Sequence, residues 1–243
     1  MQIPVIAVVI PCLNEEAPIG VVIREVLAQP VAEVIVVDNG STDGTAEVAA
    51  AAGARVVREP VRGYGRACAA GIAALRPETD IVCFLDGDGS DVPAFIPALV
   101  APLTEDRADF VMGSRLRGRR ERGSLAPQQV VAGWLAGLLL RMTYGVRFTD
   151  MSPLRAMRAD RLQALGMQEA TYGWNLEMQM RVAAAGLRSM EIPVDHRCRR
   201  GGRSKVSGNL AAGLMAACKI ASTFFRLARE LPARRRDIPR GVY

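Results

Sequence analysis

Two patterns of apolar and polar positions alternate along the first half of the chain. Short runs rich in β-branched residues are separated by segments in which apolar residues recur at helical spacing. This alternation of strands and helices predicts an α/β fold in which helices cover both faces of a mostly parallel sheet. We expect strands at residues 5–10, 33–37, 54–58, 81–85 and 109–112, and helices near residues 19–28, 45–52, 65–75 and 94–103.

The second half of the chain has a less regular pattern. A basic, glycine-bearing loop at residues 115–123 is followed by further predicted elements. These are helices at 128–142 and 173–185, a loop at 149–155, a strand at 188–194, a basic loop at 197–205, and a last helix from about 210 to about 231.

No apolar segment has the length and purity of a membrane-spanning helix. Residues 130–140 are too few, and residues 210–227 are interrupted by Lys219 and Arg226. The N-terminus lacks the basic start and cleavage site of a signal peptide. The five cysteines form no CxxC pair and have no flanking histidines, which indicates neither a zinc site nor a disulfide framework. We therefore expect a cytoplasmic protein that could lie on the cytosolic face of a membrane.

Composition matters here mainly through the distribution of charge. Half of the 243 residues are hydrophobic and 23% are charged, which is typical of a folded globular protein and excludes disorder. The net charge of +6 combines a segment of +10 at residues 197–243 with −4 for the rest. Nucleic-acid binding would predict aromatic residues among the basic ones, and the tail has only Tyr243. A membrane or protein partner is favoured instead.

Polar clusters follow the predicted strands, where parallel α/β sheets form their binding crevice. Asp86 and Asp88 follow an apolar run, and residues i and i+2 of an extended segment share one side. Both carboxylates could therefore approach one divalent cation, with Gly87 letting a ligand come close to the backbone. The alternative is a simple polar turn, but two repelling carboxylates beside a buried strand favour the metal site.

A second cluster begins at Asp38, which also ends an apolar strand. Residues 40–45 supply turn glycines and a capped helix start, so Asp38 could meet a nucleotide base or ribose, or simply end a turn. The turn around Gly63 and Gly65 is similar to a phosphate-binding glycine loop, but this glycine spacing alone is weak evidence for a phosphate site.

Taken together, five motifs resemble, in order and spacing, the family 2 glycosyltransferases of the GT-A fold. The resemblance is greatest to dolichol- and polyprenyl-phosphate sugar synthases and covers roughly residues 4–206. It extends to Asp150–Arg155 and to Ser204-Lys205, and it departs from the pattern at Asn39, Ser90 and Pro153. The motifs are Pro11–Glu15, Val37–Thr45, Gly63–Gly65, Asp86–Ser90 and Gly113–Arg115.

The resemblance implies a GT-A fold, a Rossmann-like sheet flanked by helices, at residues 1–206, and the apolar spacing and charge that follow predict a C-terminal amphipathic helix with a basic tail at 207–243. It implies an inverting transfer of a hexose from a UDP- or GDP-linked donor to a polyprenyl phosphate or other lipid acceptor. Asp86 and Asp88 would hold Mg²⁺ or Mn²⁺, with Asp88 also counted as catalytic. Donor-binding roles are implied for Pro11, Asn14, Glu15, Asp38, Gly63, Gly65, Arg203, Ser204 and Lys205.

The acceptor side leaves two chemistries open. A phosphate acceptor needs no strong base, and the resemblance implies that Arg115, Ser152 and Arg155 position its charge. A hydroxyl acceptor would need a base, for which Glu177 is the candidate, unless Glu177 pairs with Arg181 at i+4. A protein that binds a nucleotide sugar without turnover is a third alternative.

The C-terminal helix has apolar residues at helical spacing and basic edges. Such a helix could lie peripherally on an anionic membrane or pack on the catalytic domain or a second subunit. Residues 130–140 could likewise be a core helix or meet lipid. Trp174 could stack on a sugar or pack in the core, and His196, which lacks metal-binding neighbours, is expected to be incidental.

Overall fold

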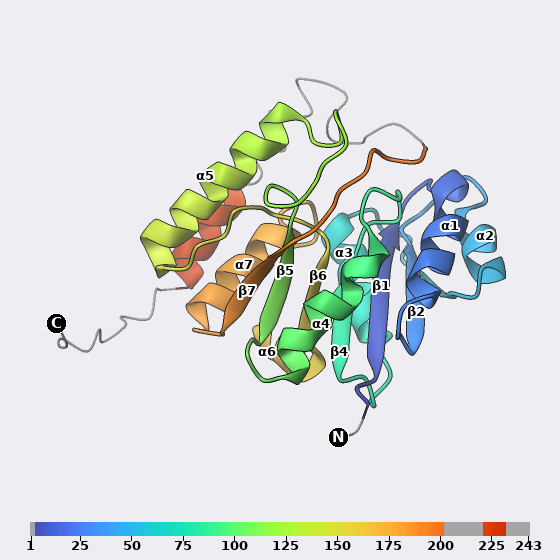
Figure 1. Ribbon diagram of the computed structural model, residues 1–243, viewed down its shortest axis with the longest axis horizontal. Coiled ribbons are helices and arrows are strands. Elements are labelled where there is room, and N and C mark those ends of the chain that lie inside the picture. The colour runs from blue at the N-terminus through green and yellow to red at the C-terminus, as the bar shows by residue number, and fades with distance from the viewer. Residues whose placement is uncertain (1–2, 202–220, 232–243) are drawn as a thin grey trace.

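The computed structural model describes residues 3–201 and 221–231. Its centre is one sheet of seven strands: β1 (Ile6–Cys12), β2 (Glu33–Asp38), β3 (Arg55–Arg58), β4 (Ile81–Phe84), β5 (Phe110–Ser114), β6 (Arg155–Arg158) and β7 (Ser189–Pro193). The spatial order is β3-β2-β1-β4-β6-β5-β7 (Figure 1). All neighbours are parallel except β6, which runs antiparallel to both β4 and β5.

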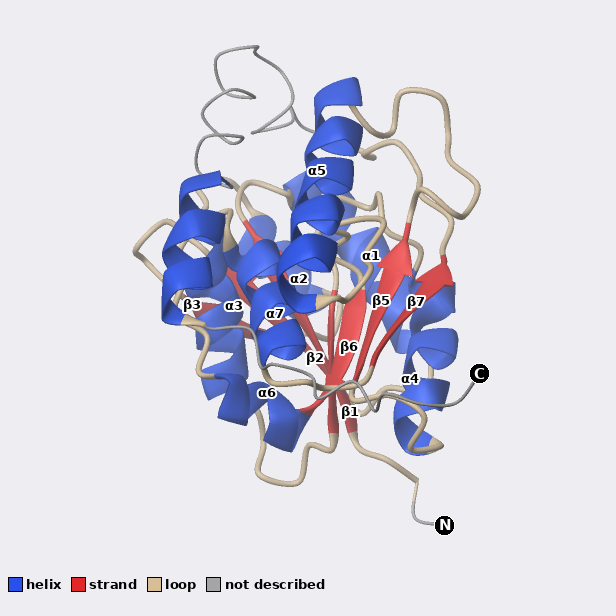
Figure 2. Ribbon diagram, turned by 90° about the vertical axis from the view of Figure 1, so that its left-hand side faces the viewer, coloured by secondary structure: helices blue, strands red, loops and turns tan. Residues whose placement is uncertain are grey.

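Helices cover both faces of the sheet. They are α1 (Glu16–Leu27), α2 (Thr45–Ala51), α3 (Tyr64–Ala73), the short 3₁₀ helix η1 (Pro93–Phe95), α4 (Ile96–Thr104), α5 (Pro127–Tyr144), α6 (Ala159–Leu165) and α7 (Trp174–Ala184). Residues 221–230 are also helical. The core on one face joins the sheet to α1, α2 and α4, and the core on the other joins it to α3, α5, α6, α7 and the 221–230 helix (Figure 2).

The central strands are buried on both faces, which explains their nearly continuous apolar sequence. In β1 every residue is buried; Val8 and Ile10 contribute to the core beneath α1, and Val9 contributes to the core beneath α3. Such strands belong inside a parallel sheet with helices on each side. The predicted α/β class and the mostly parallel sheet are therefore confirmed.

The sequence did not predict β6 or α6. It predicted a loop at residues 149–155 and assigned no element to the residues that follow, where β6 and α6 lie. The four residues of β6 are two apolar residues between two arginines, and they are too few for a periodicity signal. Pairing with β4 and β5 makes this segment a strand, and that pairing is a tertiary contact.

The connection that leads into β6 also lies at the carboxyl edge of the sheet. Because β1, β2, β4 and β5 run parallel, their carboxyl ends meet at one edge, and the segment that enters β6 arrives at the same edge.

Within the described ranges, no helix is both long and apolar enough to cross a bilayer.

Candidate active site

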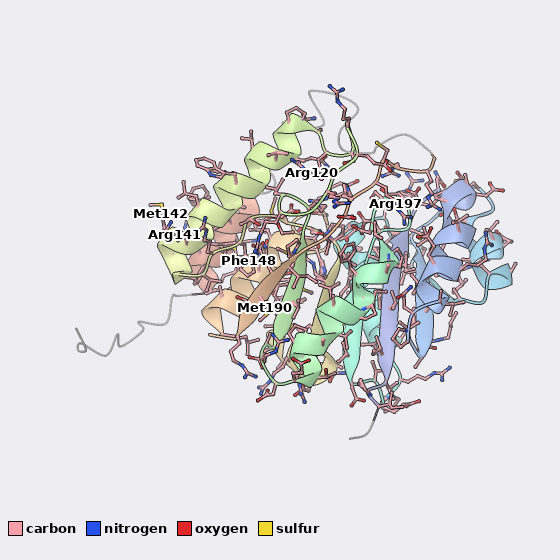
Figure 3. All side chains as sticks on the ribbon, in the orientation of Figure 1. Arg120, Arg141, Met142, Phe148, Met190 and Arg197 are labelled. Carbon is pink, nitrogen blue, oxygen red and sulfur yellow. The ribbon has the colours of Figure 1, made fainter. Side chains whose placement is uncertain are left out.

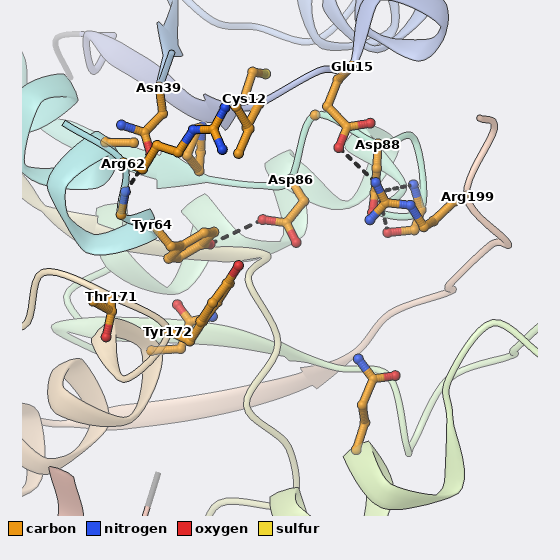
Figure 4. A pocket seen from close by; sticks show the side chains of 18 of the residues that line it. Cys12, Glu15, Asn39, Arg62, Tyr64, Asp86, Asp88, Thr171, Tyr172 and Arg199 are labelled. Carbon is orange, nitrogen blue, oxygen red and sulfur yellow. Dashed lines mark hydrogen bonds and ion pairs between the residues drawn. The ribbon is translucent and has the colours of Figure 1, made fainter. Parts of the chain in front are cut away.

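A cavity of about 610 Å³ opens at the carboxyl edge of the sheet. Its walls come from the ends of β1, β2, β4 and β5, the start of α3, the loop before α5, the segment before α7 and residues 196–199 (Figure 4). The cavity therefore brings together segments that are far apart in the sequence, as the strand order predicts.

Three carboxylates crowd one wall of this cavity. Asp86 and Asp88 line it, and Asp91 Oδ2 accepts a hydrogen bond from the Asp86 amide at 3.0 Å. Burial, with the charges of Asp88 and Asp91, raises the pKa of Asp86 to about 8. Burial also raises the pKa of Asp91 to about 7, although its hydrogen bond from the Asp86 amide opposes this rise. Such crowding is costly unless protons or a cation offset the charge.

Asp88 is oriented by its own turn and neutralised by an arginine. Its Oδ1 accepts hydrogen bonds from the Ser90 amide at 2.9 Å and from the Ser90 hydroxyl at 2.6 Å. Its Oδ2 lies 2.7 Å from Arg199 Nη1, while Arg199 Nη2 donates to Glu15 Oε1 at 2.7 Å (Figure 4). The Arg199 guanidinium therefore contacts Asp88, one of the two carboxylates that the sequence predicted would bind a cation.

These carboxylates fit a divalent cation that shares its coordination with substrate. Hard cations take oxygen ligands, and Asp86 and Asp88 present carboxylates to the cavity. In the part of the chain that the structure describes, no three His, Cys, Asp or Glu side chains form a complete metal cage. A cation held here would therefore need further ligands, such as the oxygens of a diphosphate.

A fixed positive charge, Arg115, lines the same cavity. Its Nε and Nη2 each donate to the Asp150 carboxylate at 2.8 Å, and its amide donates to Oδ2 at 2.9 Å. Burial alone would raise the pKa of Asp150, but these bonds outweigh it and hold the pKa below its usual value. The pair therefore stays ionised, and the guanidinium has a set orientation at the end of β5.

Ser152 and Arg155, predicted to position the acceptor, are fully buried and do not line the cavity. Arg155 Nε donates to the Ser152 carbonyl at 3.0 Å, and its Nη1 donates to the Asn175 carbonyl at 3.2 Å. Burial lowers the pKa of Arg155 to about 10. In this structure the two residues brace the segment before β6 against α7, and only Arg115 of the three faces the cavity.

Glu177 also lies behind the wall, with no exposed surface. Its carboxylate accepts hydrogen bonds from the Gln168 amide at 3.0 Å and the Glu169 amide at 2.6 Å. Arg181 Nε donates to it at 2.8 Å, which is the i+4 ion pair that the sequence offered as the alternative. The geometry favours this structural role over that of a base.

The predicted nucleoside side of the cavity is built on the ends of β1 and β2. Asp38 Oδ1 accepts a hydrogen bond from the Ser41 amide at 2.9 Å, and Asn14 Oδ1 accepts one from the Thr42 amide at 2.8 Å. Pro11, Glu15 and Gly63 line the cavity, whereas Asn14 lines a smaller neighbouring hollow.

Asn39, which departs from the family pattern, binds the neighbouring loop. Its Nδ2 donates to the carbonyls of Glu59 and Val61 at 3.0 and 2.8 Å, and its Oδ1 accepts from the Gly63 amide at 2.7 Å. An aspartate at this position could not donate the first two bonds. The amide therefore orders the loop that leads to α3.

Two site glycines are required by close packing. A Cβ on Gly65 would lie 1.8 Å from the Glu169 carbonyl oxygen, so this glycine lets the 169–170 segment reach α3. A Cβ on Gly87 would lie 2.4 Å from Cys12 Sγ. Gly87 is thus required by the approach of Cys12, and it also lines the cavity, where the sequence predicted that a ligand comes close.

Sequence reasoning missed several residues that form the cavity. Tyr64 donates from its hydroxyl to Asp86 Oδ1 at 3.1 Å, and Tyr172 also lines the cavity (Figure 4). His196, expected to be incidental, is a buried part of the wall with its Nδ1 3.9 Å from Asp91 Oδ1. Burial and the charge of Arg115 lower the pKa of His196 to about 4. Arg199 could have been found, because it belongs to the basic run that was assigned to the site.

The rest of that basic run is only partly described. Arg203, Ser204 and Lys205 lie outside the described residues. Before them, Arg197 Nη1 and Arg200 Nη2 each lie 2.9 Å from a carboxylate oxygen of Glu25 on α1. These ion pairs fasten the segment that carries Arg199 beside the cavity.

Comparisons with known proteins agree with this geometry. The family model described as glycosyl transferase family 2 matches residues 7–166. An uncharacterized glycosyltransferase of Mycobacterium tuberculosis is 41% identical over 87% of this chain and 94% of its own length. The undecaprenyl-phosphate mannosyltransferase of Micrococcus luteus is 30% identical over 83% of this chain and 87% of its own.

A solved structure is similar over almost the whole chain. It is the glucosyl-3-phosphoglycerate synthase of Mycobacterium tuberculosis in complex with Mn²⁺, UDP and glucosyl-3-phosphoglycerate. The TM-score is 0.74 at 28% identity, covering 96% of this chain and 82% of the synthase.

Proposed function

The chain belongs to glycosyl transferase family 2 and is a glycosyltransferase of the GT-A fold; we propose that it moves a hexose from a UDP-linked donor to a polyprenyl phosphate. The observation that carries the proposal is one cavity that is lined both by crowded carboxylates and by the fixed guanidinium of Arg115. A donor diphosphate with its cation and an anionic acceptor need these opposite charges.

The donor would enter at the ends of β1, β2 and β4, where Asp86 and Asp88 would hold Mn²⁺ or Mg²⁺. Asp38, which is buried behind the lining residues and accepts a hydrogen bond from the Ser41 amide, would have to turn to reach the nucleoside. When bound there, the cation supplies positive charge that offsets the charge of the departing nucleoside diphosphate. The solved synthase that binds Mn²⁺ and UDP supports this donor class over GDP. Arg203, Ser204 and Lys205 remain proposed contacts to the diphosphate.

The acceptor reaction follows from the charges. A phosphate oxygen attacks the anomeric carbon, the new C–O bond forms with inversion, and the bond from that carbon to the diphosphate breaks. The acceptor is already ionised, so no base has to take a proton, which agrees with the burial of Glu177. Arg115 would orient the acceptor phosphate. The mannosyltransferase of Micrococcus luteus, whose name specifies undecaprenyl phosphate, supports the lipid acceptor.

A second candidate is a small acceptor that carries a hydroxyl and a phosphate. The observation that favours it is the glucosyl-3-phosphoglycerate bound in the similar synthase. An alcohol must lose its proton during transfer, and Glu177 does not reach the cavity to accept it. This difference makes the phosphate acceptor the preferred substrate.

We place the enzyme on the cytosolic face of a membrane, as a peripheral protein. The lipid acceptor requires contact with a membrane, and within the described residues no helix can span one. Cys68, Cys83 and Cys198 are free thiols, which agrees with a reducing compartment.

Purified protein with Mn²⁺ and either UDP-hexoses or GDP-mannose tests the proposal against three acceptors: a short-chain polyprenyl phosphate, the matching polyprenol and 3-phosphoglycerate. We expect nucleotide release from a UDP-hexose only with the polyprenyl phosphate. Asp88→Asn should lower turnover at least about 100-fold, whereas Asp160→Asn, at an exposed site on α6, should not. Release with 3-phosphoglycerate alone, or with no acceptor at all, would overturn the lipid-phosphate acceptor.

A further inference from the structure

The outer face of α5 is apolar. Val131, Trp134, Leu135, Leu138 and Met142 are 62%, 63%, 48%, 37% and 76% exposed. Their spacing places them on one side of the helix. This α5 stripe accounts for five of the ten large exposed hydrophobic residues in the described chain, so it is a concentrated patch and not a scatter of single residues.

The inner face of the same helix is already satisfied by packing. Ala136, Leu140 and Tyr144 are buried in the core. Gly137 lets the helix lie close, because a Cβ there would be 2.1 Å from the Phe148 carbonyl oxygen. The α5 stripe is therefore a second apolar face of the helix, distinct from the face that packs in the core.

The charge around the α5 stripe identifies the kind of surface that it would meet. Between Leu116 and Phe148 the chain has six arginines and a single acid, Glu121. Arg120 lies in the loop that precedes α5, and Arg141 and Met142 lie near its C-terminal end (Figure 3). The stripe itself contains no acid. Two copies that met through this face would bring the arginines together, whereas an anionic lipid surface complements them.

The position of α5 relative to the cavity adds a second observation. Ser124, Leu125 and Gln129, from the start of α5 and the loop before it, line the cavity. The stripe begins at Val131, two residues after Gln129 on the same helix. A surface that covered the stripe would therefore lie next to the mouth of the cavity.

We propose that the α5 stripe docks on an anionic lipid bilayer, with Trp134 and Leu138 inserted at the interface and the flanking arginines on the headgroups. The inference rests on the proposed lipid-linked acceptor for its purpose, but its physical basis is independent of it. Docking would bring the cavity to the membrane surface, where the phosphate of a lipid-linked acceptor lies. An aromatic and aliphatic face with basic edges is typical of helices that lie in the plane of a membrane.

The full-length protein and vesicles of phosphatidylcholine with 30% phosphatidylglycerol provide the test. We expect flotation with these vesicles, weaker flotation with pure phosphatidylcholine, and a loss of at least about tenfold in partitioning for the double variant Trp134→Glu/Leu138→Glu. Ile3→Glu is the matched control, because Ile3 is 86% exposed and lies outside α5. It should bind like the wild type.

Tryptophan emission gives a local readout. The chain has two tryptophans, and Trp174 is 1% exposed. A blue shift and quenching by brominated lipids would therefore report Trp134. Absence of vesicle binding, binding that the double variant retains, or a dimer that the double variant dissociates would each overturn the proposal. Turnover with a water-soluble polyprenyl phosphate separates the two proposals, because the double variant should keep it whether or not the lipid surface is the partner.

Discussion

At the scale of single residues, Arg199 controls the charge of the cation site. Its guanidinium pairs with Asp88 and Glu15, both of which have buried carboxylates. A cation that binds Asp88 must displace this guanidinium or share the carboxylate with it. The ion pair and the metal are therefore competitors for the same charge.

This competition predicts that Arg199→Gln binds Mn²⁺ more tightly in the absence of nucleotide. We expect the dissociation constant to fall about tenfold, equivalent to about 1.4 kcal/mol. Titration of Mn²⁺ followed by electron paramagnetic resonance measures it. Arg197→Gln is the control, because Arg197 pairs with Glu25 on α1. Equal or weaker Mn²⁺ binding by Arg199→Gln would show that the pair does not compete with the metal.

The sequence predicted the places of Asp86 and Asp88 better than those of Arg155 and Glu177. Asp86 and Asp88 follow a strand whose apolar run is unmistakable, so their place at the sheet edge follows from chain order. Arg155 and Glu177 carry charges that usually mark a surface or a site. Here each is buried by partners that only the fold brings near, namely the carbonyls of Ser152 and Asn175 and the amides of Gln168 and Glu169.

At the scale of elements, the parallel strands could be predicted and β6 could not. A parallel strand that is buried on both faces has a continuous apolar sequence. In contrast, β6 begins with Arg155, whose guanidinium donates hydrogen bonds to backbone carbonyls. Apart from α6, which was missed, the helices were predicted with small errors at their ends because their apolar residues recur at helical spacing. Helix α5 differs from the others because both of its faces are apolar. Periodicity alone therefore could not show which face packs in the core.

One buried carboxylate joins the helix at 221–230 to the wall of the site. Glu169 Oε1 accepts hydrogen bonds from the Thr171 amide and hydroxyl at 3.1 and 2.6 Å. Its Oε2 accepts from Arg226 Nη2 at 2.9 Å and from the Thr223 hydroxyl at 3.4 Å. Because Thr171 and Tyr172 line the cavity, the C-terminal helix contributes to the shape of the site.

We therefore predict that Glu169→Gln lowers the free energy of unfolding by about 1–3 kcal/mol, because it removes a charge that four donors surround. Amide hydrogen exchange of residues 168–172 should become faster, which separates a local effect from a general loss of stability. Glu230→Gln breaks only an exposed pair with Arg226 and should change stability by less than about 0.5 kcal/mol. An unchanged exchange rate in Glu169→Gln would contradict the coupling.

At the scale of the whole molecule, positive charge and exposed apolar surface are both associated with α5 and its flanking loops. The total net charge of +6 does not show this distribution. On the rest of the chain, acidic residues balance most of the basic residues. The proposed division into residues 1–206 and 207–243 also needs a physical qualification. Phe224 and Leu227 are 4% and 0% exposed and belong to the core that α5 and α7 share.

Two truncations test what the C-terminal part contributes. Removal of residues 232–243 takes away four arginines and one aspartate, Asp237, a net charge of +3. Each basic residue near an anionic bilayer is worth about 1 kcal/mol, so vesicle binding should weaken by up to about 100-fold while thermal stability and turnover with a soluble acceptor are retained.

Removal of residues 207–243 also takes away Phe224, Leu227 and the partner of Glu169. Each large buried side chain contributes about 2–5 kcal/mol, so this variant should lose several kcal/mol of stability and, with it, turnover. A stable and active 1–206 fragment, measured by calorimetry and nucleotide release, would show that the helix at 221–230 is an appendage and that the coupling through Glu169 has no consequence for the site.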